Sequence, residues 1–259
     1  MATQNLASAY TEEIRDELSY LGTWLPDDQM QLGDMGVLVG QRFVRSSTLT
    51  AELGLDVGGT RELAQGDLKY HSRDAVTVSF KAQGVAPDPG LGLAQADAGV
   101  VVRFSRANAV LLEMRGRRVV SVEDQLTLGR GILRAWADGK WDPEWCVVVE
   151  AVSGDATTVL VAAEADACFE LRASGQISAV DVSLVEAGAG FQRVGSQKVG
   201  IDVVGKAEAT PLLKALRLKK HFWTRDPKVV EAGLEALPPG DPFGQSDVDE
   251  APFDLLGED

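Results

Sequence analysis

The chain has 259 residues, of which 45% are hydrophobic and 25% are charged, as in soluble globular proteins with one large domain or one domain plus an appendage. A formal net charge of -14 disfavours nucleic acid as the main partner, because phosphate binding needs a basic face. No apolar run reaches about 18 residues, and the N-terminus lacks the basic-then-apolar order of a secretory signal. We therefore expect a cytoplasmic protein without a transmembrane helix.

Two helices are predicted in the first half of the chain. An amphipathic helix over Asn5–Leu21 follows from apolar residues at every fourth position, namely Leu6, Tyr10, Ile14 and Leu18. A middle helix is expected from Ser121 to Gly139, with Asp124 near its start in a capping arrangement. Both helices are expected to pack on a sheet through their apolar sides.

Two-residue alternation and β-branched residues predict strands along most of the remaining chain. The expected strands are Gly36–Val39, Arg42–Arg45, Asp67–Ala82, Gly99–Phe104, Asn108–Met114, Trp145–Val152, Thr157–Ala163, Ala167–Ala173 and Gln176–Val185. A helical turn or loop is expected over Leu49–Leu55, and a turn at Gly58-Gly59-Thr60. The breaks after Trp145 are short, so we expect neighbouring strands there to form antiparallel hairpins.

The C-terminal third carries two further helix signals. Thr210-Pro211 resembles a helix start and opens the run PLLKALRLKKHFW, and Asp226-Pro227 repeats this pattern before a short segment that ends at Leu237. The first run is the most basic part of the chain. Its basic residues are Lys214, Arg217, Lys219, Lys220 and Arg225. They are either a solvated helix face or a contact surface for anionic lipid or an acidic partner.

An acidic tail comes next. Residues 241–259 contain seven acidic residues and no Lys or Arg, and apolar side chains interrupt them at Phe243, Phe253, Leu255 and Leu256. One interpretation is a disordered, solubilising tail. The other is a docking peptide whose apolar residues fill a groove while its carboxylates face basic side chains.

Together these features predict an α+β fold. We expect a large, twisted, mostly antiparallel sheet with an N-terminal helix, a middle helix and a C-terminal helical segment. The β-rich domain would comprise residues 1–226, and residues 227–259 would form a C-terminal helix and acidic tail.

Catalytic and metal-binding patterns are weak in this sequence. There are two histidines, His71 and His221, and two cysteines, Cys146 and Cys168, that fall among apolar strands without metal-ligand spacing. No Gly-x-Ser-x-Gly elbow is present. We therefore predict a protein that is not an enzyme, has no cofactor or metal and holds both cysteines as buried free thiols.

The order of these features resembles the pore-forming domain of bacterial gasdermins over roughly Asn5–Arg225. The N-terminal helix is followed by LGTWLPDDQMQLGDMGVLV, which looks like the family's Leu-Pro turn into a first strand. A strand similar to the one that opens the family's first insertion hairpin reads DLKYHSRDAVTVSFKA. EWCVVVEAV is similar to the Val-rich strand after the middle helix, and ATPLLKAL looks like the late Pro-Leu-Leu segment.

The resemblance implies a pore-forming effector that its C-terminal segment holds inactive. Removal of that segment by a protease would let two hairpin regions extend, and many copies would then assemble in an anionic membrane. The chain departs from bacterial members in one respect, because it has no cysteine before Cys146 that could be lipidated. The alternative hypothesis is a soluble, non-enzymatic interaction module whose acidic Phe/Leu tail binds a protein partner.

Overall fold

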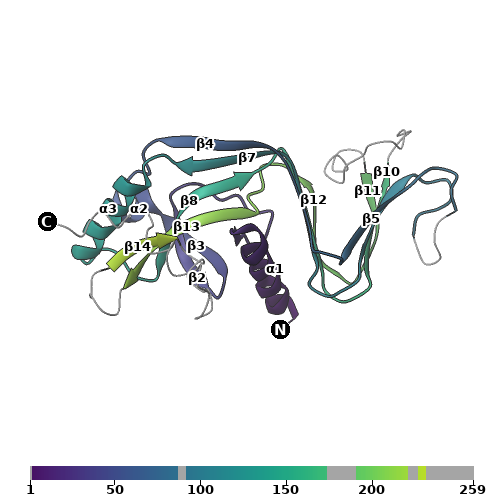
Figure 1. Cartoon of the computed structure of the whole chain (residues 1–259), viewed down its shortest axis with the longest axis horizontal. Coiled ribbons are helices and arrows are strands. Elements are labelled where there is room, and N and C mark those ends of the chain that lie inside the picture. The colour runs from purple at the N-terminus through teal and green to yellow at the C-terminus, as the bar shows by residue number, and fades with distance from the viewer. Residues whose placement is uncertain (1, 87–91, 174–190, 221–226, 232–259) are drawn as a thin grey trace. The chain divides into compact units, whose positions relative to one another are not determined.

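Side chains that alternate between apolar and polar direct most of this chain into β-strands (Figure 1). The computed structural model describes residues 2–86, 92–173, 191–220 and 227–231. The helices are α1 (Ala2–Leu18), α2 (Leu49–Leu53) and α3 (Gln125–Ala137). The α+β class with an N-terminal and a middle helix is therefore confirmed.

The strands up to α3 are β1 (Leu21–Gly22), β2 (Asp34–Val39), β3 (Arg42–Thr48), β4 (Thr60–His71), β5 (Val76–Lys81), β6 (Gly99–Phe104) and β7 (Val110–Val122). After α3 come β8 (Trp145–Ser153), β9 (Ala156–Ala162), β10 (Ala167–Ala173), β11 (Phe191–Gln197), β12 (Val199–Lys206), β13 (Leu212–Lys220) and β14 (Pro227–Glu231). Most predicted strands are confirmed within a few residues. The predicted strand Gln176–Val185 lies outside the described residues.

The strands form two sheets. A ten-stranded sheet has the main order β1-β13-β8-β7-β9-β12, and β14, β2, β3 and β4 pair beside this path. A four-stranded sheet has the order β11-β10-β6-β5. Every pairing whose register is defined is antiparallel.

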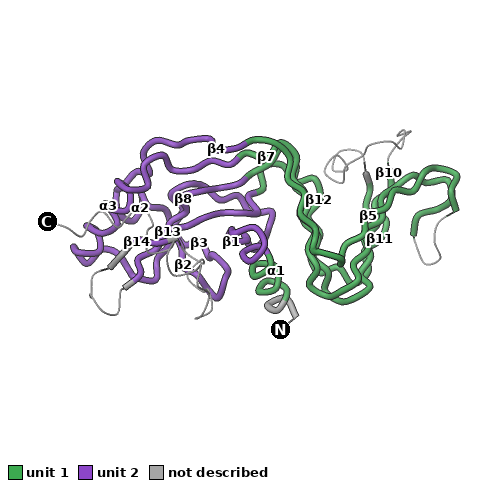
Figure 2. Tube along the Cα trace, in the orientation of Figure 1, with its two compact units in different colours: residues 1–13, 65–118, 153–209 green, residues 14–64, 119–152, 210–259 purple. Residues whose placement is uncertain are grey.

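The chain divides into two compact units that interleave along the sequence (Figure 2). Unit 1 comprises residues 1–13, 65–118 and 153–209, and unit 2 comprises residues 14–64, 119–152 and 210–259. The core of unit 2 includes Ile132 of α3, Val147 of β8 and Leu216 of β13. The core of unit 1 lies among β6, β7, β9 and β10.

The predicted C-terminal helical segment is wrong. Residues 212–220 form β13, which is hydrogen-bonded between β8 and β14, and Pro227–Glu231 forms β14. A register shift between Lys214 and Ala215 leaves Val149 of β8 as the extra residue. Strand β13 is buried on both faces, with Leu213 and Ala215 in one core and Leu216 and Leu218 in another. Its apolar residues therefore do not alternate, and their spacing imitates the three-to-four-residue period of a helix. Hydrogen bonds to β8 on one side and to β14 on the other satisfy the backbone polar groups of β13, and they stabilise a strand here instead of a helix.

Two predicted hairpins among the strands after Trp145 are also wrong, and the third, which involves Gln176–Val185, lies outside the described residues. Strands β8 and β9 both neighbour β7, and β10 belongs to the other sheet, where it pairs with β6 and β11. The break between β8 and β9 is not a turn, because the Asp155 N–H donates to the carbonyl of Arg115 in β7 at 2.9 Å. A side chain on Gly154 would meet the same carbonyl, so this break is a close approach to β7.

The middle helix starts later than predicted. Ser121 is still part of β7, and Asp124 is the N-cap of α3, where its side chain accepts a hydrogen bond from the Thr127 N–H at 2.8 Å. Of the helical turn or loop expected over Leu49–Leu55, the structure has the helical form: α2 is capped by Thr48 at its start and by Gly54 at its end.

Two glycines of unit 2 test this packing. A Cβ on Gly36 of β2 would collide with the backbone of Val44 and Arg45, which cannot move as a flexible side chain can. We expect Gly36→Ala to lower the free energy of unfolding by about 1–3 kcal/mol in urea denaturation. Gly131 of α3 has room at 3.4 Å from Leu55 Cδ1, so Gly131→Ala should leave stability unchanged or raise it by up to about 1 kcal/mol. An equal loss of unfolding free energy in Gly36→Ala and Gly131→Ala would contradict this account.

Candidate functional site

The strands of unit 1 form a four-stranded ribbon made of two hairpins (Figure 2). In the first hairpin, β4 and β5 follow each other along one side, and β6 and β7 follow each other along the other side. Strand β4 pairs with β7, and β5 pairs with β6. In the second, β9 and β10 lead outward and β11 and β12 return, with β9 paired to β12 and β10 to β11. Pairs β7–β9 and β6–β10 join the hairpins, so the lateral order is the same in both sheets.

Each ribbon strand is interrupted once, between its part in the larger sheet and its part in the smaller sheet. Every interruption contains a non-glycine residue with positive φ: Asp74 (φ 54), Asn108 (φ 61), Asp166 (φ 57) and Lys198 (φ 56). We call these four residues the corner residues. The left-handed region costs a non-glycine residue roughly 1–2 kcal/mol, and Asn and Asp tolerate it best.

Hydrogen bonds across the ribbon align the interruptions. The Ser105 N–H donates to the Ala75 carbonyl, and the Ala163 N–H donates to the Lys198 carbonyl. The Asn108 N–H donates to the carbonyl of Ala162 at 2.9 Å. The ribbon therefore folds along one line that crosses all four strands.

The fold line changes which side chains face the core of unit 1. In β6 the core residues have even numbers (Val100, Val102, Phe104), whereas across Asn108 they have odd numbers (Ala109, Leu111). In β9 they are even (Leu160, Ala162), whereas across Asp166 they are odd (Ala167, Phe169, Leu171). A strand without interruption would keep one parity on one face. In these two strands the interruption thus reverses which positions face the core.

The larger sheet of unit 1 also has a second apolar face. Val110 lies opposite Val161, Leu112 lies opposite Val159, and all four side chains are fully buried without belonging to the core described above. Helix α1 lies on this side, because a Cβ on Gly200 of β12 would meet the side chain of Leu6. The apolar residues of the ribbon are therefore divided between an inner core and a face under α1.

Charged groups fasten the connection between β5 and β6 to the smaller sheet. The buried Glu170 carboxylate accepts hydrogen bonds from the N–H groups of Gly92 and Leu93, at 2.8 and 3.2 Å. The Lys81 ammonium donates to the carbonyls of Asp97 and Gln95, at 2.6 and 3.3 Å. Because these buried charges have partners, the polar face of the smaller sheet is stable in the folded ribbon.

The predicted lipid- or tail-contact residues do not form one helical face. Lys214 lies 3.9 Å from a Glu150 carboxylate oxygen and 5.2 Å from the ring centre of Tyr20, so its charge has partners within unit 2. Arg217 is half-buried and Lys219 is exposed on β13. Lys220 is the last residue of β13. Outside the described residues lie Arg225 and the tail residues Phe243, Phe253, Leu255 and Leu256.

Of the two general-base candidates, one lies among the residues that the structure describes. His71 Nε2 lies 2.8 Å from a Glu113 carboxylate oxygen, between β4 and β7, and His221 is outside those residues. Both cysteines are free; Cys146 is buried, which raises its thiol pKa to about 11, and Cys168 is half-buried. The thiol of Cys146 is therefore protonated at neutral pH and unsuited to nucleophilic attack.

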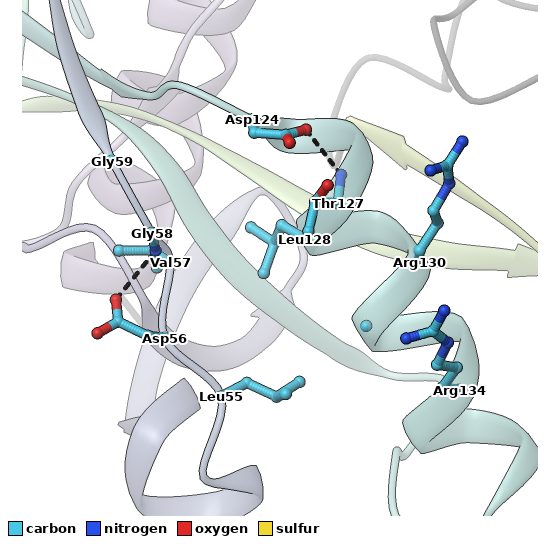
Figure 3. A pocket seen from close by; sticks show the side chains of 11 residues that line it. Leu55, Asp56, Val57, Gly58, Gly59, Asp124, Thr127, Leu128, Arg130 and Arg134 are labelled. Carbon is cyan, nitrogen blue, oxygen red and sulfur yellow. Dashed lines mark hydrogen bonds between the residues drawn. The ribbon is translucent and has the colours of Figure 1, made fainter.

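A groove of about 530 Å³ in unit 2 lies between residues 55–59 and α3 (Figure 3). Both acidic side chains of the groove accept hydrogen bonds from nearby backbone N–H groups: Asp56 from that of Gly58 at 2.9 Å, and Asp124, which caps α3, from that of Thr127. The Thr127 hydrogen bond lowers the Asp124 pKa. Gly58 has φ 75, as expected for the predicted glycine turn. This arrangement provides no acid–base pair.

No protein-family model and no curated protein sequence matches the chain. Over the described ranges, no cluster of three or more His, Cys, Asp or Glu side chains is arranged to hold a metal ion. None of the helices in those ranges is both long enough and apolar enough to cross a membrane.

The corner residues were not identified from the sequence. Short Asp- and Asn-containing breaks between strands are also what ordinary turns look like. The available signal was that in three of the four ribbon strands apolar residues keep one parity on both sides of the break, which a turn does not require.

Asn108 tests the left-handed corner directly. A β-branched side chain is poorly tolerated at positive φ, so Asn108→Val should lower the free energy of unfolding by about 1–2 kcal/mol in urea denaturation. Glycine carries no such penalty, so Asn108→Gly is the matched control and should lie within about 0.5 kcal/mol of the wild type. Equal stability of the two variants would contradict the corner assignment.

Proposed function

We propose that this protein is a pore-forming effector that its C-terminal segment holds inactive and that proteolysis releases. After release, the ribbon of unit 1 straightens along its fold line, and several copies assemble in an anionic membrane. The observation that carries the proposal is a mismatch in three of the four ribbon strands: apolar residues keep one parity across the fold line, although the folded ribbon is interrupted there.

The alternation fits a straight strand in three of the four ribbon strands. Even-numbered residues from Leu68 to Phe80 and from Val100 to Met114 are apolar on both sides of the fold line, and so are odd-numbered residues from Val159 to Leu171. If the corner residues became extended, each set would share one face. Each span exceeds the about 9–11 residues that a transmembrane strand needs.

The opposite face would be polar along the first of these strands, whereas in the second and third it also carries apolar residues such as Leu111 and Leu160. Along the first strand the odd positions are Lys69, His71, Arg73, Thr77, Ser79 and Lys81, with Ala75 among them. Lipid on one side and water on the other is the environment that this pattern matches. Phe80 already exposes 54% of its surface in the folded ribbon, which is unusual for a large aromatic side chain.

The ribbon edges support assembly into a homo-oligomer. In the described part of the chain, no strand pairs with the outer edges of β5 and β11, which end the smaller sheet. Unpaired edges are templates for pairing with another chain. Because the two edges belong to different hairpins, pairing would be head-to-tail, and such contacts can close a ring.

The C-terminal segment is suited to act as the removable part. It begins directly after β14, which pairs with β13 at the edge of the larger sheet, and its last 19 residues carry seven acidic side chains. An acidic segment repels an anionic membrane, whereas exposed basic residues such as Lys219 attract one. Removal of the tail would therefore favour membrane binding.

The alternative function, a soluble interaction module that binds a protein through its tail, is favoured by one observation. Glu170 and Lys81 hold the β5–β6 connection with buried charged hydrogen bonds, and such bonds oppose extension. In that case the folded ribbon would be a permanent scaffold.

Cleavage of the chain distinguishes the two functions. We would place a protease site between Leu237 and Pro238 of the full chain and cut the protein in the presence of dye-filled vesicles with anionic lipid. We expect dye release after cutting, faster for Asn108→Val than for Asn108→Gly, because valine favours the extended corner. The uncut protein is the control. Sealed vesicles after complete cleavage would contradict the pore-forming function.

A further inference from the structure

We propose that helix α1 is a second, internal lock on the ribbon, and that Glu13 fastens this lock at the fold line. The inference rests on the proposed pore-forming function but invokes a different part of the chain from the C-terminal segment. All contacts that carry it lie within unit 1.

Glu13 binds both strands of the first hairpin where that hairpin folds. Its carboxylate accepts hydrogen bonds from the Tyr70 hydroxyl at 2.8 Å and from the Ser72 hydroxyl, both at the end of β4. It also accepts from the Arg106 guanidinium, which lies between β6 and β7, at 3.3 Å. Hydrogen bonds to an ionised carboxylate are about twice as strong as neutral ones. One side chain of α1 thus binds both strands of the first hairpin at the fold line.

The Ser72 hydroxyl connects Glu13 to the backbone hydrogen bonds between the two strands of this hairpin. The Ser72 N–H donates to the Val110 carbonyl at 2.9 Å, as in an ordinary antiparallel pair. The return bond differs, because the Val110 N–H donates to the Ser72 hydroxyl at 2.7 Å. The Ser72 carbonyl instead accepts from the Ala75 N–H within the corner, at 3.2 Å.

A straight ribbon would need a different arrangement at this pair. The Val110 N–H would bond the Ser72 carbonyl, and both the turn to Ala75 and the hydroxyl bond would break. Glu13 opposes this exchange because it accepts the hydroxyl proton and so orients the hydroxyl oxygen toward Val110. The carboxylate therefore stabilises the folded corner over the extended one.

Helix α1 also covers apolar side chains that a membrane strand would expose. Leu6 and Tyr10 are buried, and Leu6 lies against Gly200 of β12. The neighbouring residues Val161 and Ile201 pair directly between β9 and β12 on the second apolar face. Lipid cannot reach this face while α1 occupies it. Detachment of α1 must therefore precede extension.

The test compares Glu13→Gln with Glu12→Gln in the full chain that carries the cleavable tail. Glu12 is exposed on the same helix, so its substitution makes the same charge change away from the corner. Hydrogen–deuterium exchange of the Val110 amide in the uncut, membrane-free protein is the first measurement. We expect exchange to rise about tenfold or more in Glu13→Gln and to stay at the wild-type rate in Glu12→Gln, since a hydrogen bond to a charged group contributes roughly 1.5–3 kcal/mol.

Dye release after cleavage is the second measurement, and it should be faster in Glu13→Gln than in Glu12→Gln. Gly200→Leu provides an independent variant, because the added side chain displaces Leu6 and should likewise raise Val110 exchange. Unchanged Val110 exchange in both Glu13→Gln and Gly200→Leu would overturn the lock. Raised exchange together with sealed vesicles for every cleaved protein would instead refute the pore-forming function and leave α1 as a fastener of a permanent fold.

Discussion

Successive side chains on a β-strand point to opposite faces, and the ribbon of unit 1 interrupts each strand once. In the two middle strands the interruption reverses which positions face the core. The interruptions require left-handed backbone at Asp74, Asn108, Asp166 and Lys198, none of which is glycine. They let one set of apolar side chains form an inner core while another set lies under α1. The fold of unit 1 depends on keeping these four backbone positions in the left-handed region, which Asp and Asn tolerate better than other non-glycine residues.

The folded ribbon is held by contacts that compensate for this cost. Glu13 ties α1 to the fold line through Tyr70 and Ser72, and Glu170 holds the β5–β6 connection through backbone N–H groups. Both carboxylates are largely shielded from water, so their hydrogen bonds are effective and their loss would be costly. A protein that only needed a stable scaffold could have used glycine at the corners. We propose that this arrangement lets a few contacts determine which of two packings the same strands adopt.

The α+β class and most strands followed from alternation, because two-residue periodicity reports a half-buried strand directly. The predicted C-terminal helix was wrong because β13 is buried on both faces, so its apolar residues do not alternate and have a helix-like spacing. The hairpins after Trp145 failed because a short break at Gly154 approaches β7 instead of reversing the chain. Pairing partners far apart in sequence decide both cases. The polar fastening by Glu13 likewise joins residues 57 to 93 positions apart, beyond any local pattern.

The most direct test of the fold line is the distance between spin labels on its two sides. Lys69 and Thr77 are exposed and share one ribbon strand, and the labels would be attached in a variant with Cys146 and Cys168 replaced. In a straight strand the eight-residue separation spans about 26 Å. We predict a shorter distance for the uncut protein in water and a distance near about 26 Å after cleavage on membranes. The same short distance in both states would contradict the account.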